Sequence, residues 1–217
     1  QVRDLIDSLY KGYPTGYIIL WKNPNVKLKD GTISSGKKVI IDGQQRITAL
    51  MTAVAAQKVF NNEFKECRVK IAFNPFAALD YANGNSEAEI FAVQTPAHLK
   101  SKYWIPDISE IFSTSFSSWT FIPKYIEQNP NMTGEDLQGV LNTLKGIEAI
   151  QMGVIELSEN LDIDVVTDIF IRINSKGVNL SQADFAMSKI ASSVEYGGVT
   201  MRKAIDYFCH MAVEPAF

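Results

Sequence analysis

The sequence predicts an α+β fold, in which a small mixed sheet with flanking helices is followed by a mostly helical portion. Two patterns lead to this prediction. Short runs rich in β-branched and aromatic residues, at 17–21, 38–41 and 68–73, are bounded by polar, glycine or proline residues, as strands usually are. Later in the chain, apolar residues recur mainly at helical spacing. We therefore expect an α+β domain at 1–125 and a helical extension at 126–217 that packs on it.

The first elements are expected to be a helix and a hairpin. Apolar residues recur at helical spacing over 2–11, and Gly12 suits the position after the last turn. The strands at 17–21 and 38–41 are joined by a long polar stretch in which Asp30-Gly31 supplies a turn, so we expect them to pair. A second helix should then start where the second strand ends, because apolar residues recur there at helical spacing: Ile47, Leu50, Met51 and Val54.

The later elements are less evenly marked. The stretch 77–118 mixes short apolar runs with Ser/Thr clusters and favours no particular element. Thr133 then has the position of an N-cap before a helix with apolar residues over 137–147. Residues 154–157 suit a late strand, and 163–173 form a further apolar stripe of helical period, with Ile169, Phe170 and Ile173 expected to face the core.

Composition indicates a compact module. The chain has 217 residues, of which 46% are hydrophobic and 21% charged, so it can bury a substantial core. No apolar run approaches the roughly 18 residues that would suggest a membrane span. Cys67 and Cys209 are far apart and form no paired motif, so we expect no disulfide framework and a cytoplasmic location.

Charge argues against a protein that grips a long track of DNA. The formal net charge is −3 and the pI is near 5.5, whereas DNA-binding domains usually carry a basic footprint. A local cluster of lysines could meet nucleic acid or could belong to a solvated hairpin, and we favour the hairpin. The cluster consists of Lys22, Lys27, Lys29, Lys37 and Lys38.

The most informative segment is Asp42-Gly43-Gln44-Gln45-Arg46, which lies between a strand and a helix. Backbone N–H groups at a helix start attract anions, a glycine allows close approach, and Arg46 can hold phosphate oxygens in a bidentate fork. A structural alternative is a capping box made by Asp42 and Gln45. Both interpretations can hold together, but a cap does not require Gln44 and Arg46.

A second polar segment follows the stripe at 163–173. Arg172 and Asn174 lie off this stripe near the expected helix end, and Gly177 allows a sharp reversal. Asn174 and Ser175 could simply bond the turn, while Arg172 could favour the C-terminal dipole. Alternatively, the Arg172 guanidinium could reach a phosphate that the first motif holds.

These segments resemble a known family. The pentapeptide at 42–46 resembles the signature of the N-terminal domain of GmrSD-type modification-dependent restriction proteins, within the wider ParB/sulfiredoxin-like superfamily. Residues 170–180 resemble the family's F-x-R-I-N-S-x-G-x-x-L stretch. Residues 5–20 are similar to its opening helix, turn and strand, although this match is less specific.

The resemblance implies a ParB/sulfiredoxin-like domain that binds and hydrolyses a nucleoside triphosphate in a phage-defence restriction system. It implies that the backbone around Gly43 holds phosphate oxygens and that Arg46 neutralises charge on the transferred group. Asp42 would hold Mg²⁺ or orient water, and Gln44 or Gln45 would position the attacking water. The nucleotide-binding set from the second segment would be Arg172, Asn174, Ser175 and Lys176.

Two other functions remain open from the sequence. The chain could be a non-catalytic sensor or interaction module, or it could be a ParB-like DNA-binding or nicking module. Members of the family often continue into a nuclease domain with a His-Asn-His metal site, so we expect nuclease chemistry and DNA contact to belong to domains outside 1–217. We also expect no membrane partner, and we expect that the chain can form a homo-oligomer.

Overall fold

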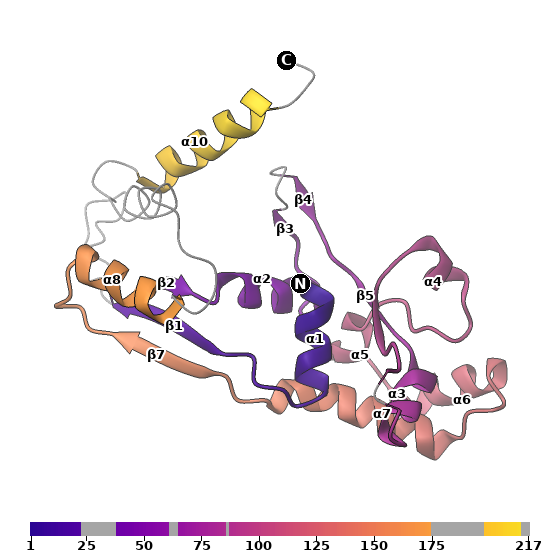
Figure 1. The fold of residues 1–217 in the computed structure, drawn as a ribbon. Helices are drawn as coiled ribbons and strands as arrows, with labels where there is room; N and C mark the ends of the chain where they lie inside the picture. The colour runs from indigo at the N-terminus through magenta and orange to yellow at the C-terminus, as the bar shows by residue number, and fades with distance from the viewer. Residues whose placement is uncertain (23–37, 61–64, 86, 175–197, 214–217) are drawn as a thin grey trace. The chain divides into compact units, whose positions relative to one another are not determined.

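The computed structural model describes residues 1–22, 38–60, 65–85, 87–174 and 198–213 (Figure 1). The chain forms two compact units, and each is built from separate stretches of sequence. Unit 1 contains Gln1–Gly16 and Gln45–Met152, and unit 2 contains Tyr17–Gln44 and Gly153–Phe217. This division differs from the expected one at residue 125, because a strand from the late part of the chain pairs with a strand from the early part.

Unit 2 contains a three-stranded mixed sheet with the order β2-β1-β7. As predicted, β1 (Tyr17–Lys22) and β2 (Lys38–Asp42) pair antiparallel, with Trp21 opposite Val39. The expected turn at Asp30-Gly31 lies outside the described residues. The late strand is also confirmed as β7 (Gly153–Leu157), which pairs parallel to β1. The small mixed sheet of the predicted α+β class is therefore present.

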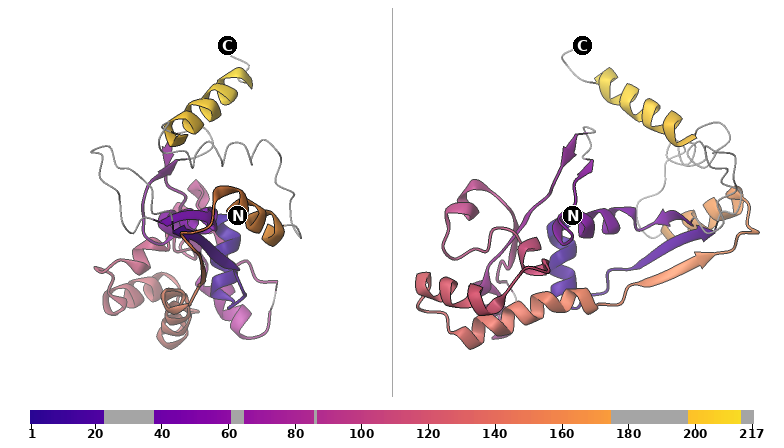
Figure 2. Two further views of the ribbon diagram at one scale, coloured as in Figure 1. Left: turned by 90° about the vertical axis from the view of Figure 1, so that its left-hand side faces the viewer. Right: turned by 180° about the vertical axis from the view of Figure 1, so that it is seen from behind.

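Helix α8 (Ile163–Asn174) packs against this sheet (Figures 1 and 2). Val166 is 1% exposed and joins a buried cluster with residues of β1 and β7, and Ile169 packs against the same cluster. Ile173 is 48% exposed, so its expected place in the core was wrong. The physical reason is the small size of the cluster, which Val166 and Ile169 reach and which Ile173, one turn further along, does not join.

The core of unit 1 surrounds a two-stranded antiparallel pair, β5 (Ile71–Phe73) and β6 (Phe91–Val93). Phe73 and Phe91 are fully buried, with ring centroids 5.4 Å apart, and Tyr10 meets Phe91 edge-on at 5.4 Å. Burial of three such rings is a major source of hydrophobic stabilisation. Helix α7 (Gly134–Lys145) adds a stripe of buried residues at helical spacing: Leu137, Val140, Leu141 and Leu144.

Local sequence signals explain several helix ends. Helix α1 (Val2–Tyr10) is confirmed, and Gly12 follows it with φ +69°. The Gly12 N–H donates to Leu9 O and the Tyr13 N–H to Ser8 O, which is a Schellman motif. Thr133 caps α7 as predicted, because its hydroxyl accepts from the Asp136 N–H at 3.1 Å.

The predicted strand at 68–73 is shorter in the structure. Only Ile71–Phe73 forms β5, and the residues before it bond elsewhere. The Val69 N–H donates to Thr52 Oγ1 at 2.8 Å, and the Arg68 guanidinium donates to Asp107 Oδ1 at 2.9 Å. The backbone N–H of Val69 therefore bonds a side chain and not a neighbouring strand.

Some of the remaining described elements lie in the region 77–118, where the sequence favoured no assignment. In none of the described helices is there a stretch long and apolar enough to cross a membrane. The elements are α2 (Gln44–Ala53), β3 (Val59–Phe60), β4 (Glu66–Cys67), α3 (Pro75–Ala82), α4 (Pro96–Lys100), α5 (Ser109–Phe112), α6 (Ser118–Gln128), η1 (Gly146–Ala149) and α10 (Gly198–Val213).

Candidate functional site

The segment 42–46 forms the strand–glycine–helix turn that the sequence predicts. Asp42 is the last residue of β2 and lies opposite Ile19, and Ile41 is an extra residue that bulges the strand just before the turn. Gly43 is buried and has φ +95°, a backbone conformation that L side chains rarely adopt. Helix α2 begins at the next residue. A glycine is therefore required where the chain changes from strand to helix.

The start of α2 bears on the capping-box alternative. Because the first helical residue is Gln44, the position before the helix is held by Gly43 and not by Asp42. Gln45 is then the second helical residue, whereas a capping box needs its glutamine at the third. With this helix start, Asp42 and Gln45 stand one position earlier than a capping box places them, and the capping interpretation stays a prediction.

The side chains of the turn differ in exposure. Gln44 and Gln45 are exposed, whereas Asp42 and Arg46 are half-buried. Exposed amides on the first turn of a helix can be reached by a dissolved ligand. Gln44 is exposed and Arg46 is only half-buried, so neither is enclosed among apolar residues, and the anion site at this turn stays a prediction.

Arg46 contacts the loop between α1 and β1. Its Nη1 donates to the carbonyl oxygen of Thr15 at 3.0 Å. The guanidinium also lies directly against Gly16, since a Cβ built on that glycine would be 2.8 Å from Nη1. Sequence reasoning did not include Thr15 and Gly16 among the site residues. The available signal was the less specific match over 5–20, which contains both.

The second segment is described only in part. Arg172 lies in the last turn of α8, and its Nε donates to Asp168 Oδ2 at 2.9 Å. The two side chains are 77% and 58% exposed, so this ion pair contributes little to stability. Asn174 is the last residue of α8, and Ser175 and Lys176 lie outside the described residues. A ligand shared by Arg172 and Arg46 stays a prediction.

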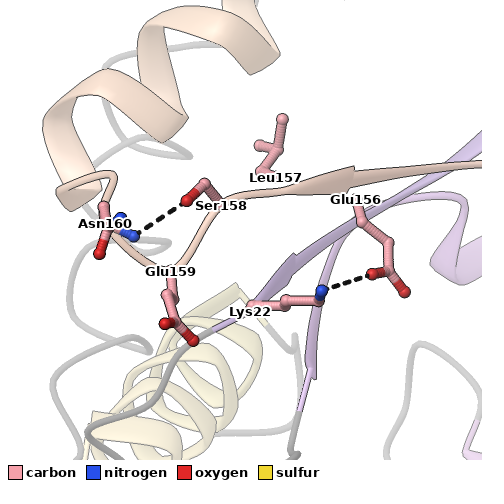
Figure 3. Close-up of a pocket in the computed structure, with 6 residues that line it drawn as sticks. All are labelled: Lys22, Glu156, Leu157, Ser158, Glu159 and Asn160. Atoms are coloured by element: carbon pink, nitrogen blue, oxygen red, sulfur yellow. Dashed lines mark hydrogen bonds and ion pairs between the residues drawn. The ribbon is translucent and has the colours of Figure 1, made fainter.

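Unit 2 also has an open surface pocket of about 410 Å³ at the end of β1 and β7 (Figure 3). Lys22 Nζ lies 3.1 Å from Glu156 Oε2, and Lys38 pairs with the other oxygen of the same carboxylate. Hydrogen bonds from Lys38 and Lys22 hold the pKa of Glu156 below its usual range. Two of the five lysines in the predicted cluster thus join strands of the sheet through Glu156, and the other three lie outside the described residues.

Comparison of the sequence with known protein families gives a result that does not depend on the structure. Residues 1–191 match the family model for the N-terminal domain of the GmrSD restriction endonuclease. This range contains both the turn at 42–46 and the segment at 170–180. Comparison with curated proteins finds no match. The match covers most of the chain, and the chain therefore belongs to the family of GmrSD restriction endonuclease N-terminal domains, a family of restriction and phage-defence proteins.

Proposed function

We propose that the turn at 42–46 binds a nucleoside triphosphate and hydrolyses it as part of a restriction system. The observation that carries this proposal is the left-handed Gly43, which joins a strand end to a helix start beside two exposed glutamines. Backbone N–H groups at the start of a helix are a general anion-binding arrangement. The family supplies the biological setting, and the turn supplies the chemistry.

Each residue of the turn has a proposed role. The backbone from Gly43 to Gln45 would contact phosphate oxygens, and Arg46 would neutralise the charge that develops on the transferred phosphoryl group. Gln44 or Gln45 would orient the attacking water through its exposed amide. Positioning and electrostatic stabilisation are the main requirements of phosphoryl transfer, and these side chains can supply both.

Mg²⁺ fits this scheme only if the protein and the nucleotide bind the ion together. Over the described ranges, no group of three or more His, Cys, Asp or Glu side chains could hold a metal. Asp42 would therefore bind Mg²⁺ together with phosphate oxygens and water, which is how this ion is commonly bound in phosphoryl-transfer sites. The ion would neutralise phosphate charge, and we accordingly expect it to strengthen nucleotide binding.

Titration calorimetry with ATP and GTP, with and without Mg²⁺, tests the proposal together with a phosphate-release assay. Arg46→Ala should weaken binding about tenfold or more, the factor that corresponds to one charge-assisted hydrogen bond. Arg3→Ala is the matched control, because Arg3 is 45% exposed and pairs with Asp4 at the start of α1. It should bind like the wild-type chain.

The outcomes separate the competing functions. Binding with turnover supports the proposed hydrolase, whereas binding without turnover indicates a sensor module. Failure of the wild-type chain to bind either nucleotide would refute the proposal. A DNA-binding titration at several salt concentrations tests the remaining alternative, since contact with phosphates of DNA would make the affinity fall steeply with salt.

A further inference from the structure

We propose that Gly16 and Thr15 are positioning residues that hold the Arg46 guanidinium in place for phosphate binding. This inference rests on the proposed function, and it extends the site to a loop that neither motif contains. The carbonyl oxygen of Thr15 would orient the guanidinium, and the missing side chain at Gly16 would leave the space that it occupies.

The contacts between Arg46 and the loop are close. The Nη1–Thr15 O distance is 3.0 Å, within the normal range for a hydrogen bond. A Cβ at Gly16 would lie 2.8 Å from Nη1 and 3.7 Å from Cζ of Arg46. The first distance is shorter than real Cβ contacts, so the guanidinium would have to move if residue 16 carried any side chain. Gly16 also has φ +82°, which disfavours a side chain independently.

The loop that carries Thr15 and Gly16 is held in place because the preceding helix, α1, packs in the core. Ile6 is 0% and Leu9 is 3% exposed, and the Schellman bonds at Gly12 and Tyr13 close the helix end immediately before the loop. Lys11 adds an ion pair to Asp7 at 2.8 Å on a largely buried part of the helix. The position of Thr15 O is therefore tied to the packing of α1.

The backbone of Arg46 is fixed by helix α2, to which this residue belongs. Arg46 shares a helix face with residues three, four and seven positions later, and this face packs toward the core. Thr52 is 1% exposed and accepts a hydrogen bond from the Val69 N–H at 2.8 Å, which fixes the helix further. The residues of the shared face are Arg46, Ala49, Leu50 and Ala53.

This arrangement restricts a side chain that otherwise loses considerable entropy when it binds. A guanidinium has five N–H donors, and a bond from Nη1 to a backbone carbonyl orients the whole planar group. Groups that are held in place before the ligand arrives bind more tightly and stabilise transition-state charge better. Displacement of Arg46 from the loop should therefore reduce phosphate binding even though the arginine is retained.

Gly16→Ala tests the inference, with Gly84→Ala as the matched control in a different loop. Both glycines have positive φ, +82° and +102°, but nothing lies within 4 Å of a Cβ at Gly84. Both variants share the backbone strain, and only Gly16→Ala displaces Arg46. With ATP or GTP as the probe, Gly16→Ala should weaken binding about tenfold. Gly84→Ala should change it less than about twofold.

A double-mutant cycle separates positioning from general damage. If Gly16 acts through Arg46, then Gly16→Ala should have no further effect on nucleotide binding when Arg46→Ala is already present. In urea unfolding, Gly16→Ala should also destabilise the Arg46→Ala background less than the wild-type chain, since the clash is gone. This second readout needs no ligand and therefore remains decisive if nucleotide binding itself is absent.

Two results would overturn the inference. One is equal binding by Gly16→Ala and Gly84→Ala while Arg46→Ala binds weakly, which would leave the proposed function intact. The other is additivity of Gly16→Ala and Arg46→Ala in urea unfolding. Wild-type binding by Arg46→Ala would contradict the proposed function and, with it, the role of this contact in phosphate binding, whereas the unfolding cycle would still measure the contact itself.

Discussion

Substitution of Gly43 by alanine should damage both the turn and the binding of nucleotide. The residue has φ +95°, and an L side chain in the left-handed region costs about 1–2 kcal/mol. For a chain of this size, each kcal/mol corresponds to about 2–4 °C in Tm, so we expect a decrease of about 2–8 °C. If the backbone relaxes to relieve the strain, the first N–H groups of α2 move away from the positions proposed to meet phosphate.

Gly84 offers a matched control in a different loop. Its φ is +102° and nothing lies within 4 Å of an added Cβ, so Gly84→Ala carries the same kind of strain without any contact. Both variants should lose comparable stability in urea unfolding. Only Gly43→Ala should also lose nucleotide affinity in calorimetry, by about tenfold if one charge-assisted contact is lost.

Two results would refute this reasoning. Wild-type stability for Gly43→Ala would mean that the backbone at this residue does not need the left-handed region. A destabilised Gly43→Ala that binds nucleotide like the wild-type chain would remove the turn from the binding site.

Three further predictions concern charge and pH. Asp107 is 2% exposed and contacts the Arg68 guanidinium at 2.8 Å, so Asp107→Ala should lower the free energy of unfolding in urea by about 3 kcal/mol. The double variant with Arg68→Met should lose less than the two single variants lose together, and strict additivity would contradict this. Lys38 and Lys22 lower the pKa of Glu156, so its contribution to the free energy of unfolding is present above the ordinary value of 4.5 and is lost as pH falls through the lower folded value. Glu156→Gln should therefore make the free energy of unfolding depend less on pH below 4.5, and an unchanged slope would count against the ion pairs. Burial raises the pKa of Tyr10 from 10.0 to about 12, so the free energy of unfolding should fall as pH rises between these values. Tyr10→Phe should reduce this fall in urea unfolding at alkaline pH, and an equal fall in both proteins would count against burial of the Tyr10 hydroxyl.

Local physics made several features predictable from the sequence. The hairpin strands, the turn at Gly43 and the helix end at Gly12 follow from conformational preferences that act within a few residues. Thr133 could be assigned for the same reason, because its hydroxyl bonds an N–H only three residues away. The family resemblance also depended on short contiguous motifs, and the family match over 1–191 agrees with it.

Other features depend on pairs of residues that are far apart in the chain. Strand β7 joins the sheet through parallel pairing of Tyr17 with Gly153, and no local pattern specifies such a partner. The expected strand at 68–73 is shorter in the structure, where the Val69 N–H bonds the Thr52 hydroxyl, 17 residues earlier. The division of the chain into two discontinuous units follows from contacts of the same kind.

The candidate site shows the same contrast within one residue. The sequence by itself determined that Arg46 stands on the first turn of a helix after a glycine, because that arrangement depends on the backbone preferences of its neighbours. Only the tertiary structure decided that Arg46 bonds Thr15 O, 31 residues earlier, and fills the space beside Gly16. Local preferences extend over a few residues, whereas the direction of a long side chain is set by whichever distant segment packs against it.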